Sequence, residues 1–194
     1  TKNGIIKKVD SKHFQDVRRS GIIAIRLQKN DVLAWVLAAE KGDHLVLTTK
    51  KGQAIRFKES DARQMGRGAQ GVKAIRLKKS DELVGADVIS AKENDALLLA
   101  VTENGYGKKT KLGQYRVQRR GGSGIKTAKL TSKTGNLVSA KVISPELEEL
   151  IAISKKGQVI RTPLKEISVL GRATQGVRIM RLESKDQLAS ITCL

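Results

Sequence analysis

Thr49-Lys50-Lys51-Gly52 opens a stretch of this chain whose pattern is written four times. The other copies of the opening motif are Thr1-Lys2-Asn3-Gly4, Thr102-Glu103-Asn104-Gly105 and Ser154-Lys155-Lys156-Gly157. Successive copies lie about fifty residues apart, which indicates a repeat architecture. Each copy runs on to a second glycine, at Gly21, Gly71, Gly124 or Gly176, which starts an apolar run ending in leucine. Any residue type held at one position of every copy is therefore displayed several times along the assembly.

Four short apolar runs can be followed through the copies. The first is 32–38, 83–89, 137–143 and 188–194; the second is 45–49, 97–102 and 150–154; the third is 5–9, 53–57, 106–110 and 158–162; the fourth is 21–27, 71–77, 124–130 and 176–182. These runs are rich in Val, Ile and Leu and are bounded by Gly, Asn, Asp and Ser, which is typical of strands joined by tight turns. The pattern predicts an all-β fold, a propeller-like disc of about four four-stranded blades.

We expect one modular array with repeats at about 1–31, 32–81, 82–135 and 136–185 and a final strand at 186–194. The second run of the first copy is missing. The chain is therefore expected to be a piece of a longer protein. An alternative is that the C-terminal strand near 188–194 completes the sheet begun at the N-terminus.

The composition points to a polyanionic partner. The 194 residues include 38 Lys and Arg against 19 Asp and Glu, giving a net charge of +19 and a pI near 10.3. Nucleic acid and an anionic membrane surface are the candidates, but no apolar stretch has the roughly 18 residues of a membrane span and no basic amphipathic helix is readable. Without a signal peptide, and with Cys193 as the one cysteine, the chain is expected in the cytoplasm, associated with the nucleoid, without a disulfide framework or a metal site.

Two basic positions recur in the strands. Lys8, Arg56, Lys109 and Arg161 stand four residues after the opening glycines, and Arg26, Arg76, Lys129 and Arg181 stand just before the closing leucines. Solvent-facing strand positions accept lysine or arginine in any protein, but acidic residues serve equally well there. None of the eight positions is acidic, which favours a basic surface.

The connections between the third and fourth runs are also basic and rich in glycine. They carry Arg18, Arg19, Arg63, Arg67, Arg116, Arg119, Arg120 and Arg172. Glycine lets a backbone approach phosphate closely, and arginine pairs with phosphate oxygens through two parallel hydrogen bonds. Aromatic residues make up 3% of the chain, too few for stacking on single strands. We therefore expect contact with the backbone of double-stranded DNA, with sequence preference arising through bendability.

The box Gln118-Arg119-Arg120-Gly121-Gly122-Ser123-Gly124 resembles the Gln-Arg-Arg-Gly-Gly-Lys-Gly box of the C-terminal domain of the bacterial DNA gyrase A protein. The resemblance covers essentially the whole chain and implies a β-pinwheel, in which neighbouring blades exchange strands. It also implies that DNA wraps around the outer edge of the disc to support negative supercoiling. The implied partners are double-stranded DNA, the ATPase B subunit, and the remainder of the gyrase A protein. ATP and Mg²⁺ would be bound elsewhere in that complex, with no cofactor, metal or catalytic residue in this chain.

Two departures keep other interpretations open. Ser123 stands where the family box has lysine, and the box lies in the third copy, whereas in the family it lies in the first blade. One alternative is a topoisomerase IV-type domain, which selects and bends DNA without chiral wrapping. Another is a protein-interaction propeller. An independent enzyme is disfavoured, since His13 and His44 lack spaced partners for a metal site or a triad.

Overall fold

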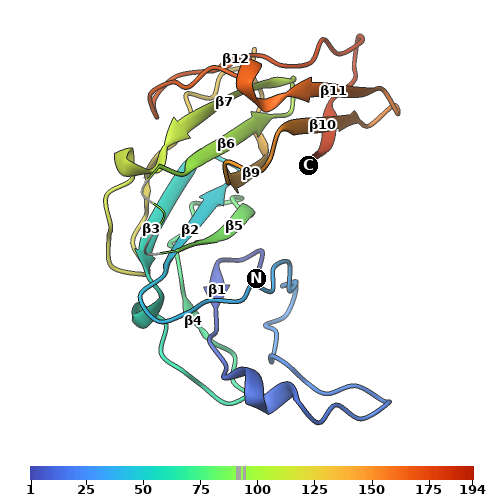
Figure 1. Ribbon diagram of the computed structural model, residues 1–194. Helices are drawn as coiled ribbons and strands as arrows, with labels where there is room; N and C mark the ends of the chain where they lie inside the picture. Colours follow the sequence, from blue (N-terminus) through green and yellow to red (C-terminus); the bar gives the residue numbers. More distant parts are fainter. Residues whose placement is uncertain (91–92, 94) are drawn as a thin grey trace.

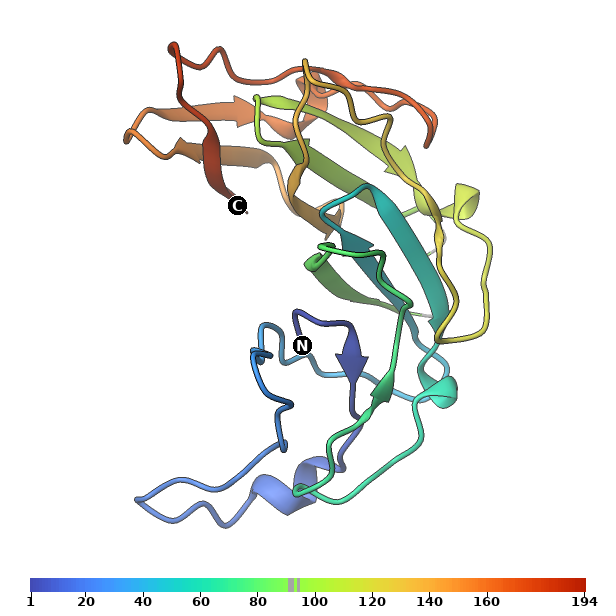
Figure 2. The ribbon, with the colours of Figure 1, turned by 180° about the vertical axis from the view of Figure 1, so that it is seen from behind.

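The computed structural model describes residues 1–90, 93 and 95–194 and arranges their antiparallel sheets along an open arc (Figures 1 and 2). The strands are β1 (Ile5–Ile6), β2 (His44–Thr49), β3 (Gln53–Lys58), β4 (Val72–Lys73), β5 (Leu83–Ile89), β6 (Leu97–Thr102), β7 (Tyr106–Lys111), β8 (Ile125–Lys126), β9 (Leu137–Ile143), β10 (Glu149–Ser154), β11 (Val159–Pro163), β12 (Val177–Arg178) and β13 (Leu188–Cys193). Short 3₁₀ turns follow the third strands: η1 (Ser11–Phe14), η2 (Glu59–Asp61), η3 (Leu112–Gln114) and η4 (Leu164–Glu166).

Each sheet combines strands from two successive repeats. The two four-stranded sheets have the orders β5-β2-β3-β8 and β12-β7-β6-β9. In both, the two middle strands form a hairpin of one repeat, and the two flanking strands come from the next repeat along the chain. The sheets β11-β10-β13 and β1-β4 follow the same rule with fewer strands. The all-β, strand-exchanged fold expected from the sequence is therefore confirmed.

The boundaries of several strands also agree with the sequence. The runs at 83–89, 97–102 and 137–143 coincide with β5, β6 and β9. Alternate residues of the middle strands face different cores, because successive strand side chains point to opposite faces. In β2, Leu45 and Leu47 pack in one cluster and Val46 in the next. In β6, Leu98 faces the same cluster as Val46, and Leu99 faces a third cluster. Burial on both faces explains why these runs are continuously apolar.

Two predicted strands near the N-terminal end of the chain are wrong. Residues 21–27 and 32–38 form no strand. Their counterparts pair with the hairpin of the preceding repeat, and within the described part of the chain these two segments have no such hairpin beside them. Leu33 is 39% exposed as a result, whereas the equivalent Leu83 and Leu137 are 3% and 1% exposed.

The alternative role for the C-terminal strand is also wrong. β13 pairs along its length with β10, in the register Leu150 to Cys193, and not with any strand near the N-terminus. Figure 1 accordingly places the two ends of the chain on different sheets of the arc.

In three of the four copies, an aspartate fixes the opening hairpin against the following repeat. Its Oδ1 atom accepts two backbone N–H groups, one from each repeat. These donors are Asn3 and Val32 at Asp31, Lys51 and Glu82 at Asp81, and Lys156 and Gln187 at Asp186. In the remaining copy the turn carries Gly135, and the acceptor is Oε2 of Glu103 in the hairpin, which binds the N–H of Asn136 at 2.9 Å.

The sheets present one edge to the inside of the arc and the other to the outside. β5 contacts β9, and β9 contacts β13, so these strands line the inside. β4, β8 and β12 end their sheets on the opposite edge, along the convex side seen in Figure 2. Residues on β4, β8 and β12 and in the loops beside them therefore form the outer rim.

The contact between inner strands depends on Gly85. A Cβ atom there would lie 2.2 Å from the carbonyl oxygen of Ala140 on β9, so Gly85→Ala must push two sheets apart. We expect the free energy of unfolding to fall by about 1–3 kcal/mol in urea denaturation. Gly113→Ala is the matched control, because a Cβ at Gly113 meets no atom within 4 Å. Equal stability of the two variants would contradict this packing.

Candidate nucleic-acid interface

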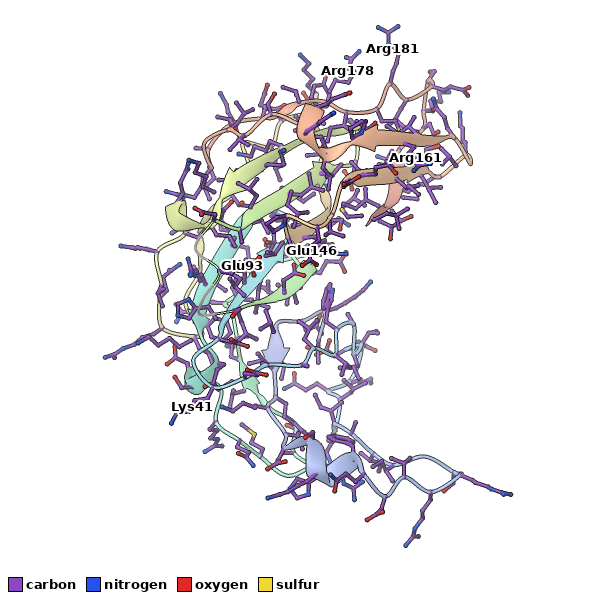
Figure 3. All side chains as sticks on the ribbon, viewed as in Figure 1. Lys41, Glu93, Glu146, Arg161, Arg178 and Arg181 are labelled. Atoms are coloured by element: carbon purple, nitrogen blue, oxygen red, sulfur yellow. The ribbon has the colours of Figure 1, made fainter. Side chains whose placement is uncertain are left out.

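The short fourth strands place exposed basic side chains along the outer rim. Lys73, Lys126 and Arg178 end β4, β8 and β12 and are all exposed. These three residues were not predicted from the sequence, although each stands two residues after the second glycine of its copy. Arg178 projects outward in Figure 3, as does Arg181. Convex curvature combined with repeated positive charge is an arrangement that can follow a bent polyanion.

The predicted positions before the closing leucines follow β4, β8 and β12 by three residues in three copies, whereas Arg26 stands in a segment without a strand. Arg26, Arg76, Lys129 and Arg181 are exposed in all four copies. The predicted loop residues that are exposed as well are Arg18, Arg19, Arg63, Arg116 and Arg119. These nine residues, together with Lys73, Lys126 and Arg178, are called the rim set below.

Three loop arginines are half-buried because each is tied to the preceding repeat. Their guanidinium groups donate to main-chain carbonyls at equivalent places in the fourth runs. The contacts are Arg67 Nη1 to Ile23 O (3.5 Å), Arg120 Nη1 to Lys73 O (2.7 Å) and Arg172 Nη1 to Lys126 O (2.9 Å). Since a guanidinium has five N–H donors, each retains donors that no protein acceptor uses in these contacts.

The box residues bind the previous repeat through their main chain. Gly121 donates its N–H to Ala74 O at 2.7 Å, and Gly122 O accepts from Arg76 N at 2.8 Å. Gly124 has a φ of +72°, and a Cβ there would lie 2.6 Å from Ala54 O, so only glycine fits at this crossing.

The two box arginines differ in their surroundings. Arg120 also donates from Nε to Asp61 O at 3.0 Å, which anchors it, whereas Arg119 is exposed. Gln118 donates its N–H to Arg56 O at 2.7 Å, and Ser123 is exposed. The box therefore combines one anchored and one outward arginine.

The predicted basic position four residues after the opening glycine makes a structural contact in three copies. Each side chain reaches the first carbonyl of the 3₁₀ turn in the next repeat. The contacts are Lys8 Nζ to Glu59 O (3.4 Å), Arg56 Nη1 to Leu112 O (3.2 Å) and Lys109 Nζ to Leu164 O (2.7 Å). Lys109 is 7% exposed, and burial lowers the pKa of its ammonium. In the fourth copy, Arg161 pairs instead with the carboxylate of Glu149.

Two further lysines, also missed from the sequence, lie beneath the rim. Lys108 is 1% exposed, and its Nζ donates to Gly171 O at 2.6 Å, Arg172 O at 2.5 Å and Thr174 Oγ1 at 3.0 Å. Burial, reinforced by the positive charge of Arg172, lowers the pKa of Lys108 to about 8. Lys7 occupies the equivalent position in the first copy.

A cavity of about 300 Å³ lies between the hairpin turn at Asn104 and residues 178–183. Its wall includes Tyr106, whose ring has Lys133 Nζ and Arg178 Cζ each 5.5 Å from its centroid. Arg178 Nη2 donates to the Tyr106 hydroxyl at 2.9 Å, which lowers the pKa of that hydroxyl. The aromatic ring thus holds two cations near the rim.

The described residues contain no group of three or more His, Cys, Asp or Glu side chains placed to hold a metal ion. Within the same residues, no helix has the length and apolar character needed to cross a membrane.

The lowered pKa of Lys108 predicts a pH dependence of stability. Between about pH 8 and about pH 10.5 the unfolded chain retains a proton that the folded chain has lost, so stability rises with pH through this window. Lys108→Met removes this contribution. Urea denaturation at both ends of the window should therefore show wild type gaining stability relative to Lys108→Met. A constant difference between the two proteins would contradict the burial of this ammonium.

Comparison of this chain with known proteins identifies a family with the same sequence pattern and fold. The family model described as DNA gyrase C-terminal domain, beta-propeller, matches residues 1–40, 43–90, 96–144 and 148–194. The DNA gyrase A protein of Ureaplasma parvum serovar 3 is 43% identical over 191 residues, which is 98% of this chain and 22% of that protein. The chain thus spans about a fifth of the length of the curated relatives it matches.

Two solved structures share the fold. A structure of the DNA gyrase A C-terminal domain superposes with a TM-score of 0.85 at 31% identity, covering 99% of this chain and 63% of that one. The crystal structure of the C-terminal domain of DNA topoisomerase IV gives 0.91 at 24% identity, covering 100% and 59%. The second likeness shows the fold alone. By sequence and by fold, this chain belongs to the family of DNA gyrase C-terminal β-propeller domains.

Proposed function

We propose that this chain binds double-stranded DNA along its outer rim and bends it, as the DNA-wrapping part of a type IIA topoisomerase. The observation that carries the proposal is the set of exposed cations at the ends of β4, β8 and β12, namely Lys73, Lys126 and Arg178, which recur at equivalent places along the convex edge. The names of the relatives, which are DNA gyrase A proteins, support the same partner. The chemistry of strand passage, with its ATP and Mg²⁺, belongs in this proposal to the B subunit, and to the rest of the gyrase A protein.

The rim suits the backbone of a duplex rather than its base edges. Its donors are Lys and Arg side chains on short strands and Gly-rich loops, without a helix or ribbon long enough to enter a groove in the described part of the chain. Phosphates of both DNA strands would be neutralised at successive repeats, and the convex path would reward bending. Sequence preference would then follow from the ease of bending.

The two groups of predicted basic residues take different parts in this proposal. The rim set makes the phosphate contacts, with Arg67, Arg120 and Arg172 contributing the donors left free by their carbonyl contacts. Lys8, Arg56 and Lys109 hold neighbouring repeats together, since their side chains are engaged in the next repeat. They support the curvature of the rim instead of touching DNA.

A topoisomerase IV-type role, with bending but without chiral wrapping, is the second candidate. Ser123 favours it, because this exposed box position carries lysine in the gyrase box and serine here removes a charge from the rim. The two roles differ in the handedness that they impose on bound DNA.

Binding through phosphate contacts predicts a steep salt dependence. If about six phosphates are neutralised, affinity for a short duplex should fall by about a thousandfold between about 50 mM and about 200 mM salt. Fluorescence anisotropy measures this, and Arg76→Ala should reduce the slope of log affinity against log salt by about one. Lys185→Asn serves as the comparison, because Lys185 is an exposed turn residue outside the rim set and the slope should stay unchanged. A flat salt response would rule out the electrostatic interface.

Wrapping predicts a signed change in DNA topology. Relaxed plasmid is incubated with the domain, closed by ligase, stripped of protein and resolved on a two-dimensional gel. A shift to topoisomers of one sign is expected if the rim wraps DNA with one handedness, and Arg119→Ala with Arg120→Ala should reduce it more than it reduces binding. Binding without a signed shift would favour the topoisomerase IV-type role.

A further inference from the structure

Lys7 and Lys108 stand at equivalent positions, and each binds one of the connections between a third and a fourth run. These connections contain glycine and arginine and are called the Gly-Arg loops. Lys108 Nζ donates to the carbonyls of Gly171 and Arg172 and to the hydroxyl of Thr174. An ammonium has three N–H donors, so these contacts use all of them. The partners all belong to the loop of the next repeat, which carries Arg172 to the rim.

Lys7 repeats this arrangement in the first copy. Its Nζ donates to Ala24 O at 2.6 Å, to Arg67 O and to Ala69 O at 3.2 Å. Two of these acceptors lie in the loop that carries Arg67. Burial and the charge of Arg67 lower the pKa of Lys7, in the same direction as for Lys108.

The second and fourth copies have isoleucine at this position. Ile55 is fully buried, and its Cδ1 lies 3.7 Å from an ideal Cβ at Gly122 of the box. Ile160 is the residue in the fourth copy. Where the loop carries the adjacent pair Arg119 and Arg120, the support beneath it is therefore apolar, and where the loop carries Arg67 or Arg172 without an adjacent arginine, the support is an ammonium.

The contacts around Arg172 show what the ammonium achieves. Its carbonyl accepts from Lys108, its N–H donates to Gln114 Oε1 at 3.3 Å, and its Nη1 donates to Lys126 O at 2.9 Å. The residue is thus held at its main-chain acceptor, its main-chain donor and its side chain. Without Lys108, the carbonyls of Gly171 and Arg172 would lose a charge-assisted donor, and the loop would gain freedom.

We propose that Lys7 and Lys108 are positioning residues for DNA binding, which fix the Gly-Arg loops so that Arg67 and Arg172 face the duplex. The inference rests on the proposed function. Lys108 is too deeply buried, and its donors are too fully used, to touch phosphate itself. It acts through Arg172, and it leaves the box unaffected, since the box rests on Ile55.

A double-mutant cycle tests this coupling in the 194-residue chain. The variants are Lys108→Met, Arg172→Ala and the two combined, each measured for affinity to a short duplex and for its salt slope. We expect each single variant to lose about fivefold to tenfold in affinity and to lower the slope by about one. The combined variant should lose no more than about twofold beyond Arg172→Ala, because Lys108 has no other route to DNA. Losses that multiply would overturn the proposal.

Two controls separate positioning from loss of charge and from misfolding. Lys185→Asn removes one positive charge from an exposed turn position whose equivalent in the first copy is Asn30, and it should leave the salt slope unchanged. Lys108→Ile places at this site the residue that the second copy already uses, and it should fold and repeat the affinity loss of Lys108→Met. A folded Lys108→Ile protein with wild-type affinity would contradict the role of the ammonium.

Hydrogen exchange in the absence of DNA gives an independent measurement. Amides of residues 171–176 should exchange faster in Lys108→Met than in wild type, while those of residues 119–124 in the box stay unchanged. Unchanged exchange at 171–176 overturns the inference. A wild-type chain that binds no duplex would overturn the proposed function and this inference with it, whereas wild-type binding with no loss in Lys108→Met would overturn this inference alone.

Discussion

The whole structure depends on main-chain hydrogen bonds that cross from one repeat to the next. A hairpin such as β2-β3 leaves both of its outer edges unpaired, and unpaired buried backbone groups are costly. β5 and β8 of the following repeat fill those two edges. Because every repeat completes its predecessor, the sheets must stand in chain order along an arc, and the short outer strands must all lie on its convex side.

Part of the positive charge at the contacts between repeats is placed so that it keeps its external effect. Lys108, Lys109 and Arg172 all bind main-chain carbonyls, which carry no formal charge. Pairing them with carboxylates would have neutralised them and weakened the field over the rim. Carbonyl partners satisfy the donors and still leave the potential positive, which is consistent with a net charge of +19 in a chain of this size.

The sequence predicted the strands well and the tasks of the basic residues only in part. Runs such as 83–89 were readable because both faces are buried, so the residues are uniformly apolar. The failed strand at 32–38 has the same composition, and what it lacks is a neighbouring hairpin, which composition does not encode. Lys109 and Lys129 recur with equal regularity in the sequence, yet one is buried in the next repeat and the other is exposed. Lys7 and Lys108 were not predicted as functional residues, because the equivalent residues of the second and fourth copies are Ile55 and Ile160.

Gly135 stands where the other copies have Asp31, Asp81 or Asp186, and this difference prevents a simple exchange of its repeat with the others. An ideal Cβ at Gly135 would lie 2.9 Å from Glu103 Oε2, so an aspartate there would bring two carboxylates into contact. Conversely, if the hairpin of Lys51 were joined to a turn with glycine at the position of Gly135, no carboxylate would accept the N–H of Lys51. The junction between Glu103 and Gly135 thus has its own matched pair of hairpin and turn, while the other three share the aspartate contact. Duplication or shuffling of single repeats by recombination would be penalised wherever the Glu103 hairpin or the Gly135 turn met an aspartate-type partner, so the interface chemistry keeps this one hairpin and turn together.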